Sequence, residues 1–209
     1  MLVKWVRCSV EPDGQRAFSV AQAGWDRLAG EPGLVGQIGG WDVRSPELAC
    51  VIGLWHDRSS YGDFMAARHD DLVAALGQTG TYSSIDIAVG EVLTNIGDGG
   101  ALREGGVLRI ADCLVRSERV DHFVTVQEQV WIPGMTAAPG MLGGWFSQLA
   151  SNRFLVTTLW RDLDSHAAYV ADRLPDLRAQ AQVDDDVLDL AGHVAALEPS
   201  WHVLGAAVS

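Results

Sequence analysis

The feature that most constrains this chain is an internal repeat. Residues 3–8 (VKWVRC) correspond to residues 108–113 (LRIADC), and residues 54–57 (LWHD) correspond to residues 159–162 (LWRD). Both matches have the same offset, since 113 − 8 = 105 and 160 − 55 = 105. Phe18 and Phe123 keep this offset, and Trp25 matches Trp131 after a small insertion. So many matches in one order predict a tandem duplication.

Each copy has the pattern strand, helix, strand, strand, helix, strand. In the first copy, we expect strands at residues 2–10, 34–43, 47–56 and 82–93, and helices at residues 14–28 and 59–76. The second copy repeats this order at residues 107–116, 117–131, 141–149, 153–162, 164–182 and 193–204. Ser59 or Ser60 is the expected N-cap of the second helix. The acidic run at residues 184–186 is expected to cap a short extra helix before the last strand.

This element order is that of the ferredoxin-like unit, so the predicted fold class is α+β. One such unit leaves one face of its sheet without helices. We therefore predict two tandem ferredoxin-like βαββαβ repeats packed sheet to sheet as an intramolecular α+β barrel, with repeats at 1–96 and 107–209 and a Gly-rich linker at 97–106. Two independent domains are the alternative, but each would expose an apolar sheet.

Charge and cysteine content restrict partners and compartment. The net charge of −12 and the absence of a basic cluster argue against a nucleic-acid partner. Three scattered cysteines without a C-x-x-C pair fit a reducing cytoplasm better than a disulfide framework. Residues 1–10 form neither a signal peptide nor a membrane span, so we expect a cytoplasmic protein without a membrane partner.

Several segments resemble the dimeric α+β barrel superfamily, and in particular its YdbC-like branch of bacterial proteins. The resemblance is carried by residues 3–8, by residues 36–41 (GQIGGW), and by residues 54–55 followed by Ser-Tyr at 60–61, Phe-Met at 64–65 and His-Asp at 69–70. The second copy looks like a diverged member. The superfamily includes antibiotic-biosynthesis-type monooxygenases, haem-degrading oxygenases, chlorite dismutase-like proteins and non-catalytic stress proteins, so membership does not assign a function. The resemblance implies a pocket between the sheet and its two helices.

His69 is the most suggestive single residue. Haem-degrading relatives carry an axial histidine on the equivalent helix, which His69 is expected to occupy near its end, while the second copy has Leu174 at this position. A haem site would need one ring nitrogen free and the other held by an acceptor. Asp70 is expected to point away from His69, and a solvated or capping histidine is the alternative interpretation.

Aromatic and polar residues of the first copy are the other candidates. Trp25 and Trp55 recur in the second copy and are expected mainly in the core, whereas the unpaired Trp5 and Trp41 are better candidates for a pocket wall. The complete set of expected pocket residues is Trp5, Trp25, Trp41, Trp55, Phe64 and Tyr61. The expected catalytic set is His69, Gln22 and Arg7. Gln22 contributes only if its helix face points inward, and an exposed helical amide is an equal alternative.

Signals for a metal or a nucleotide cofactor are weak. The remaining histidines have no ligand spacing with a carboxylate, and no phosphate-binding or dinucleotide fingerprint occurs. Cys8 and Cys113 occupy repeated strand positions and are expected in the core. We therefore expect no metal and no cofactor, with haem as the alternative.

Three functions remain open. The first is a cofactor-independent monooxygenase that oxidises an aromatic phenol or quinol in an apolar pocket. The second is haem binding or degradation through His69, and the third is non-catalytic binding of a small apolar or aromatic molecule. A pocket open in the first copy and filled in the second would favour the first two functions. Two filled pockets would favour the third, and the pseudo-dimer is a possible homodimer in either case.

Overall fold

The computed structural model describes residues 1–97, 102 and 105–206 of the chain. These residues form two compact units, unit 1 from Met1–Val89 with Ala195–Ser209 and unit 2 from Gly90–Val194. Each unit is a ferredoxin-like α+β fold with an antiparallel sheet, as predicted. Most of the expected Gly-rich linker, at residues 98–101 and 103–104, lies outside the described residues.

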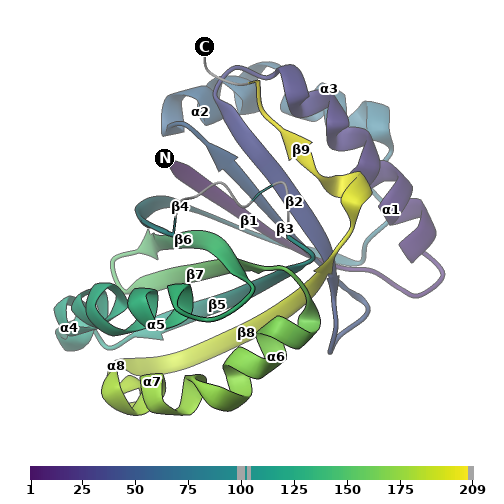
Figure 1. Ribbon diagram of the computed structural model, residues 1–209. Coiled ribbons are helices and arrows are strands. Elements are labelled where there is room, and N and C mark those ends of the chain that lie inside the picture. The colour runs from purple at the N-terminus through teal and green to yellow at the C-terminus, as the bar shows by residue number, and fades with distance from the viewer. Residues whose placement is uncertain (98–101, 103–104, 207–209) are drawn as a thin grey trace. The chain divides into compact units, whose positions relative to one another are not determined.

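Unit 1 has the strand order β4-β1-β3-β2, labelled in Figure 1. Its strands are β1 (Leu2–Ser9), β2 (Leu34–Asp42), β3 (Leu48–Trp55) and β4 (Ser84–Ile96). The register places Leu2 opposite Trp55 between β1 and β3, and Ile38 opposite Ile52 between β2 and β3. The central strand β3 is a continuous apolar run buried on both faces, which is why it lies inside the sheet.

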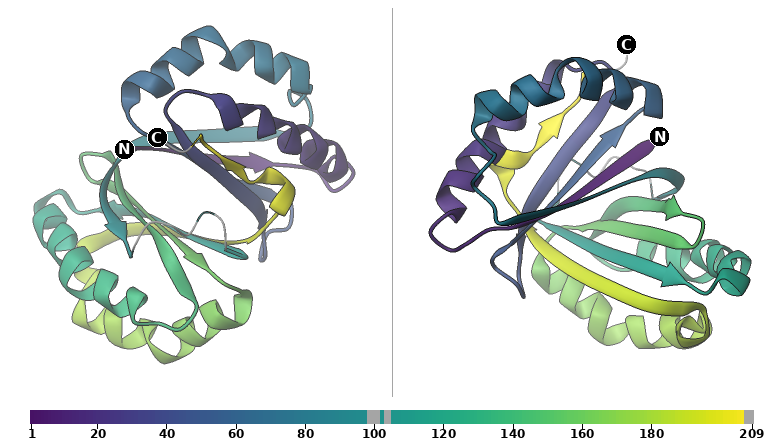
Figure 2. Two further views of the ribbon diagram at one scale, coloured as in Figure 1. Left: turned by 45° about the horizontal axis from the view of Figure 1, so that its top comes forward. Right: turned by 180° about the vertical axis from the view of Figure 1, so that it is seen from behind.

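The helices of unit 1 cover one face of its sheet (Figure 2). They are α1 (Gln15–Ala23), the 3₁₀ helix η1 (Gly24–Gly30), α2 (Arg58–Ala67) and α3 (His69–Leu76). The helix predicted at residues 59–76 is therefore two helices, because Arg68 leaves the helical region with a φ of −138°. His69 is the first residue of α3, so the prediction that it lies near the C-terminal end of a single second helix was wrong. The prediction of a serine N-cap was also wrong, since Asp57 accepts a hydrogen bond from the Ser60 backbone N–H at 2.8 Å.

Unit 2 repeats this arrangement with the order β8-β5-β7-β6. Its strands are β5 (Val107–Val115), β6 (Met141–Ala150), β7 (Arg153–Trp160) and β8 (Val187–Leu197). Its helices are η3 (Ser117–Arg119), α4 (Val120–Val126), the π-helical η4 (Gln127–Trp131), α5 (Ile132–Thr136), α6 (Leu163–Asp172), α7 (Leu174–Gln180) and α8 (Val183–Asp186). The expected short helix is present as α8, but the acidic run lies inside it and its N-cap is Gln182, so the expected capping role of the run was wrong.

The last strand predicted at residues 193–204 is wrong in its bounds. β8 already begins at Val187 and ends at Leu197, and the 3₁₀ turn η5 (Pro199–Trp201) separates it from the short β9 (Val203–Leu204). Pro199 lacks a backbone N–H and cannot continue a strand ladder, which explains the interruption.

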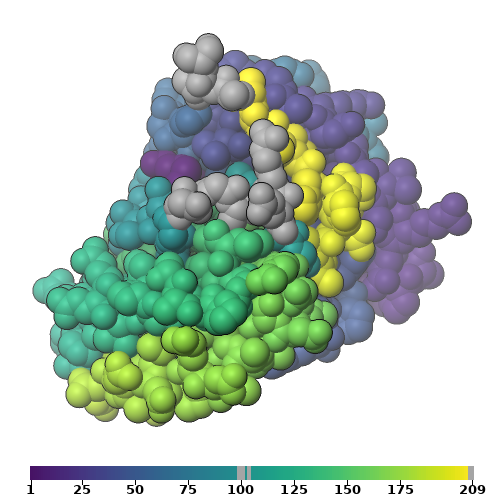
Figure 3. Space-filling view, viewed as in Figure 1, coloured from purple at the N-terminus to yellow at the C-terminus, as the bar shows by residue number. Residues whose placement is uncertain are grey.

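The final strand of each sequence repeat ends in the other compact unit. Residues 91–96 of β4 pair with β6 in unit 2, whereas Ala195 and the two residues after it pair with β2 in unit 1. The C-terminal segment, yellow in Figure 3, then packs on unit 1, where the Trp201 ring lies 5.7 Å from Phe18 and 5.5 Å from Trp41. The boundaries of the units therefore differ from those of the repeats.

The core of each unit lies between its sheet and helices. In unit 1 the Trp55 ring stacks on Phe64 at 5.1 Å, and in unit 2 the Trp160 ring packs on Tyr169 at 4.9 Å. Trp55 and Trp160 are at most 2% exposed, which matches the expectation that the repeated tryptophans pack in the core. Among the described residues, no helix is long and apolar enough to cross a membrane.

Candidate functional site

A cavity of about 210 Å³ lies in unit 1, lined by residues of the sheet, α3 and the first helix. Side chains alternate along a strand, so β1 presents Lys4, Val6 and Cys8 to this space. A buried cavity of about 150 Å³ is large enough to hold benzene. The unit 1 cavity therefore has room for a small substituted aromatic molecule.

A chain of side-chain hydrogen bonds forms one wall of this cavity. Trp25 Nε1 donates to Gln78 Oε1 at 2.8 Å, and Gln78 Nε2 donates to Gln22 Oε1 at 2.8 Å. All three side chains are at most 9% exposed. Within the described residues, nothing accepts from Gln22 Nε2, and the buried Gln37 Nε2 has no partner either. Two amide donors at the cavity are therefore available to a bound molecule.

Lys4 is the only lysine in the chain, and it lines the cavity. Burial lowers the pKa of its ammonium group from 10.5 to about 8, while the nearby Cys8 thiol opposes that shift. Its Nζ atom lies 5.8 Å from the centre of the Tyr61 ring, and in the described part of the chain no carboxylate forms an ion pair with it. An amine with a pKa lowered by burial is suited to accept a proton near neutral pH.

His69 also lines the cavity, from the first turn of α3. Its Nδ1 atom lies 2.8 Å from an Asp70 carboxylate oxygen, so the expectation that Asp70 points away from it was wrong. The imidazole packs against the rings of Trp25 at 6.0 Å and Phe64 at 5.8 Å. Asp70 is almost fully exposed, so solvent screens the attraction between its carboxylate and the His69 imidazole.

Three of the residues singled out from the sequence meet at this cavity, namely His69, Gln22 and Trp25. Arg7 and Trp5 do not line it, because they occupy the other face of β1, where the guanidinium stacks 4.8 Å above the indole and lies 3.4 Å from Asp86. The other four expected residues are packed in hydrophobic contacts and do not line this space: Trp41, Trp55, Phe64 and Tyr61.

Sequence reasoning missed Lys4, Gln37 and Gln78 as site residues. A signal for Lys4 was present, because a chain with 15 basic residues uses lysine only once and places it on a strand face with Val6 and Cys8. Gln78 lies after α3 without helical periodicity, and its role is visible only once Trp25 and Gln22 are brought beside it.

Unit 2 has a cavity of about 100 Å³ at the same place in its fold. Arg109, Cys113, Gln127 and Trp131 line it where Lys4, Cys8, Gln22 and Trp25 line the cavity of unit 1. We considered an open pocket in the first copy and a filled one in the second, but neither cavity is filled. The cavity of unit 1 is about twice as large as that of unit 2.

The polar groups of the two cavities differ. At the positions of His69 and Gln78, unit 2 has Leu174 and Val183. The Val183 side chain has no donor, and consequently the Oε1 atom of the buried Gln127 has no hydrogen-bond partner among the described residues. A buried acceptor without a partner costs about 1–3 kcal/mol.

The first helix of unit 2 contains one residue more than its counterpart. Gln22 and Trp25 are three residues apart, whereas Gln127 and Trp131 are four apart. The π-helical segment η4 spans this stretch, and a π turn absorbs one extra residue within a helix. Trp131 therefore still reaches the cavity of unit 2.

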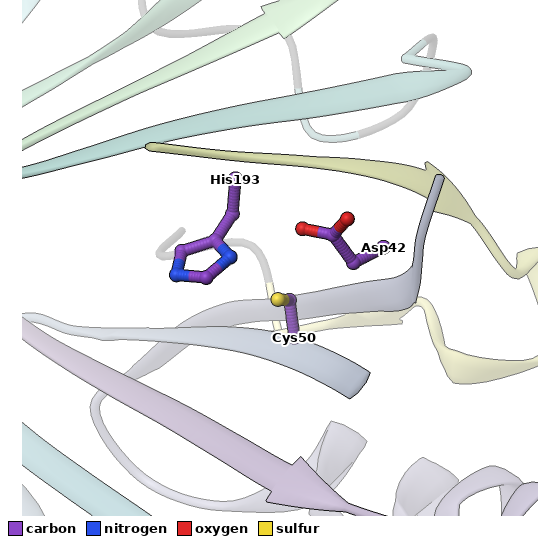
Figure 4. A group of neighbouring side chains, drawn as sticks. All are labelled: Asp42, Cys50 and His193. Atoms are coloured by element: carbon purple, nitrogen blue, oxygen red, sulfur yellow. The ribbon is translucent and has the colours of Figure 1, made fainter. Parts of the chain in front are cut away.

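The three cysteines are free and buried, which confirms the expectation that Cys8 and Cys113 lie in the core. Burial raises the pKa of each thiol to about 12, which makes all three poor nucleophiles and poor metal ligands at neutral pH. In unit 1, ligand atoms of Asp42 and Cys50 lie within 4.8 Å of each other. Figure 4 labels both side chains. The third side chain in that view, His193, belongs to unit 2.

Comparison with known proteins gives two matches at the level of sequence. A family model described as a domain of unknown function (DUF4937) matches residues 2–89. The YdbC protein of Bacillus subtilis is 33% identical over 93 residues, which cover 44% of this chain and 78% of YdbC. The family model therefore matches the first copy.

Solved structures match over nearly the whole chain. A proposed monooxygenase of Lactobacillus acidophilus has a TM-score of 0.71 at 14% identity, covering 97% of this chain and 95% of that one. An anthrone oxidase-like protein has a TM-score of 0.72 at 14% identity, covering 99% of this chain and 96% of that one. At 14% sequence identity, these structural matches show that the fold is shared.

Proposed function

Because the chain belongs to the YdbC family, within the antibiotic-biosynthesis-monooxygenase-like proteins, we propose that unit 1 oxidises a small aromatic phenol or quinol with molecular oxygen and without a cofactor. The observation that carries this proposal is the cavity in which a single half-buried amine, Lys4, lies among apolar walls and two available amide donors. The free thiols agree with a cytoplasmic location, which is part of the same proposal.

Lys4 is proposed to be the catalytic base. A free phenol has a pKa of about 10, so it is almost fully protonated in water at pH 7. In the cavity, the neutral amine of Lys4 takes the phenolic proton, and the resulting ammonium and phenolate attract each other strongly in apolar surroundings. Gln22 Nε2 is placed to donate a hydrogen bond to the phenolate oxygen, and the Trp25 indole forms a flat wall for the ring.

The electrons for the reaction come from the substrate. The phenolate adds oxygen at a ring carbon that bears hydrogen, and the proton held by Lys4 completes the hydroperoxide. Loss of water from that carbon leaves a carbonyl group. One oxygen atom of O₂ therefore enters the quinone product, the other leaves as water, and Lys4 returns to its neutral form.

Oxygen uptake with phenol and α-naphthol tests this proposal. The protein should consume one O₂ per quinone formed, and added catalase should return no oxygen because no hydrogen peroxide is released. Lys4→Met should lower the rate about 100-fold or more, the usual contribution of a general base. Arg7→Met is the matched control, because Arg7 lies on the opposite face of β1. Saturable phenol binding without oxygen uptake would instead support the non-catalytic function.

Haem binding is a second candidate, favoured by the contact between His69 Nδ1 and Asp70 that an axial histidine requires. The volume of the cavity argues against it, since about 210 Å³ is less than the roughly 300–1,000 Å³ of sites for larger ligands. The residues present therefore do not enclose a haem. A haemin titration of the wild type beside His69→Ala separates the two functions, because a saturable Soret change that is lost in the variant would favour haem.

A further inference from the structure

We propose that the cavity of unit 2 is a second binding site, specific for a short aliphatic carboxylate that carries a hydroxyl group. The inference concerns the diverged copy and does not depend on oxidation in unit 1. It rests on three features of this cavity as the described residues form it. The Arg109 guanidinium has no ion pair, the buried Gln127 Oε1 atom has no hydrogen-bond partner, and the space that both of them line is small and mostly apolar.

The cation is Arg109, on β5. It lines the cavity and, within the described residues, it makes no hydrogen bond or ion pair. Arg178 from α7 lines the same space and pairs at 2.9 Å with Asp184, which is 91% exposed. No carboxylate side chain is among the described residues that line the cavity. Two guanidinium groups against apolar walls attract an anion, and the planar guanidinium matches a carboxylate in particular.

The acceptor is Gln127 Oε1. The Gln127 side chain is 3% exposed and lines the cavity, and in the part of the chain that the structure describes this oxygen accepts no hydrogen bond. In unit 1 the equivalent Gln22 oxygen accepts from Gln78, and Val183 replaces Gln78 in unit 2. A ligand that presents a hydroxyl donor to Gln127 supplies the hydrogen bond that the protein itself no longer makes.

The volume of the cavity and its apolar lining restrict the size and shape of the ligand. The cavity of about 100 Å³ is smaller than the roughly 150 Å³ that holds benzene, so an enclosed aromatic ring is disfavoured. Trp131, Met135 and Leu174 provide apolar contacts for a short alkyl chain. A short chain with a carboxylate at one end and an adjacent hydroxyl, such as α-hydroxybutyrate, satisfies all three features.

Calorimetric titration of the full chain with α-hydroxybutyrate and with butyrate tests the proposal. We expect saturable binding of α-hydroxybutyrate at one site per chain, with butyrate at least about tenfold weaker because it leaves Gln127 Oε1 without a donor. Arg109→Met should abolish binding. Lys4→Met, the same change at the equivalent position of unit 1, should leave the affinity unchanged.

Three results would overturn the proposal: no saturable binding, equal affinities for the two ligands, or loss of binding in Lys4→Met with retention in Arg109→Met. Thermal unfolding of each variant checks that it folds. If Arg109→Met does not fold, Ala111→Val replaces it, because Ala111 lines the cavity at 2% exposure and a larger side chain there occupies the proposed site. Unchanged binding in a folded Ala111→Val protein would also contradict the proposal.

Discussion

Replacement of Lys4 by methionine should stabilise the protein, and the gain should depend on pH. Burial lowers the folded-state pKa of Lys4 from 10.5 to about 8. The folded protein therefore holds the Lys4 proton less tightly than the unfolded chain does. This difference corresponds to about 3 kcal/mol, at about 1.4 kcal/mol per pKa unit. Below pH 8 both states carry the proton, so the folded state bears the whole cost of burying the charge.

The sign of the pH dependence follows from this cost. As pH rises from 8 towards 10.5, the folded state loses the proton while the unfolded state keeps it, and the wild type gains stability relative to Lys4→Met. The advantage of the variant should be about 3 kcal/mol at pH 6 and about 1.5 kcal/mol at pH 9.5. Methionine keeps the length and the apolar stem of lysine, so packing changes little.

Urea unfolding followed by tryptophan fluorescence at several pH values measures this difference. Arg7→Met is the control, since Arg7 lies on the other face of β1 and pairs with the exposed Asp86. Its effect should be small and nearly constant between pH 6 and 9.5. A difference between wild type and Lys4→Met that does not change with pH would refute the lowered pKa, and with it the proposed role of Lys4 as a base.

Three further predictions concern hydrogen bonds, thiols and an ion pair. Gln78→Leu should destabilise the protein by about 2–4 kcal/mol in thermal or urea unfolding, because Trp25 and Gln22 each lose a buried partner, and Gln22→Leu in the same chain should recover part of this loss. The three thiols should not react with a disulfide reagent at pH 7 until urea unfolds the chain, and fast labelling of the folded protein would contradict their raised pKa values. Asp186→Leu should cost about 3–5 kcal/mol, since the fully buried Asp186 accepts hydrogen bonds at 2.7 Å from Arg119 and His122; a loss below about 1 kcal/mol would show that water replaces the lost hydrogen bonds of Arg119 and His122.

The fold could be predicted because its signals are local. The repeat offset and the alternation of apolar residues give the element order of each copy without any knowledge of tertiary contacts. The break at Arg68 and the start of β8 at Val187 could not be predicted in this way. A one-residue kink has no periodic signature, and the exchange of strand ends between the units depends on register with distant strands.

The site was predicted in part for a similar reason. Helical periodicity put Gln22 and Trp25 on one face of the first helix but did not decide whether this face points inward, and in the structure both residues line the cavity. For β1, alternation separates Lys4 from Arg7 but does not say which face meets the helices, and the prediction chose the wrong one. Binding and catalysis at these residues stay predictions, as does a homodimer.

The π turn of η4 accommodates the one residue by which the second copy is longer than the first in this helix. An inserted residue in an α-helix rotates everything after it by about 100°, which would have turned Trp131 away from the sheet. The wide turn at residues 127–131 confines that rotation to one place, so the residues on both sides keep their contacts. Deletion of Glu128, an exposed residue in this turn, should therefore remove the π turn and restore the three-residue spacing that Gln22 and Trp25 have in the first copy.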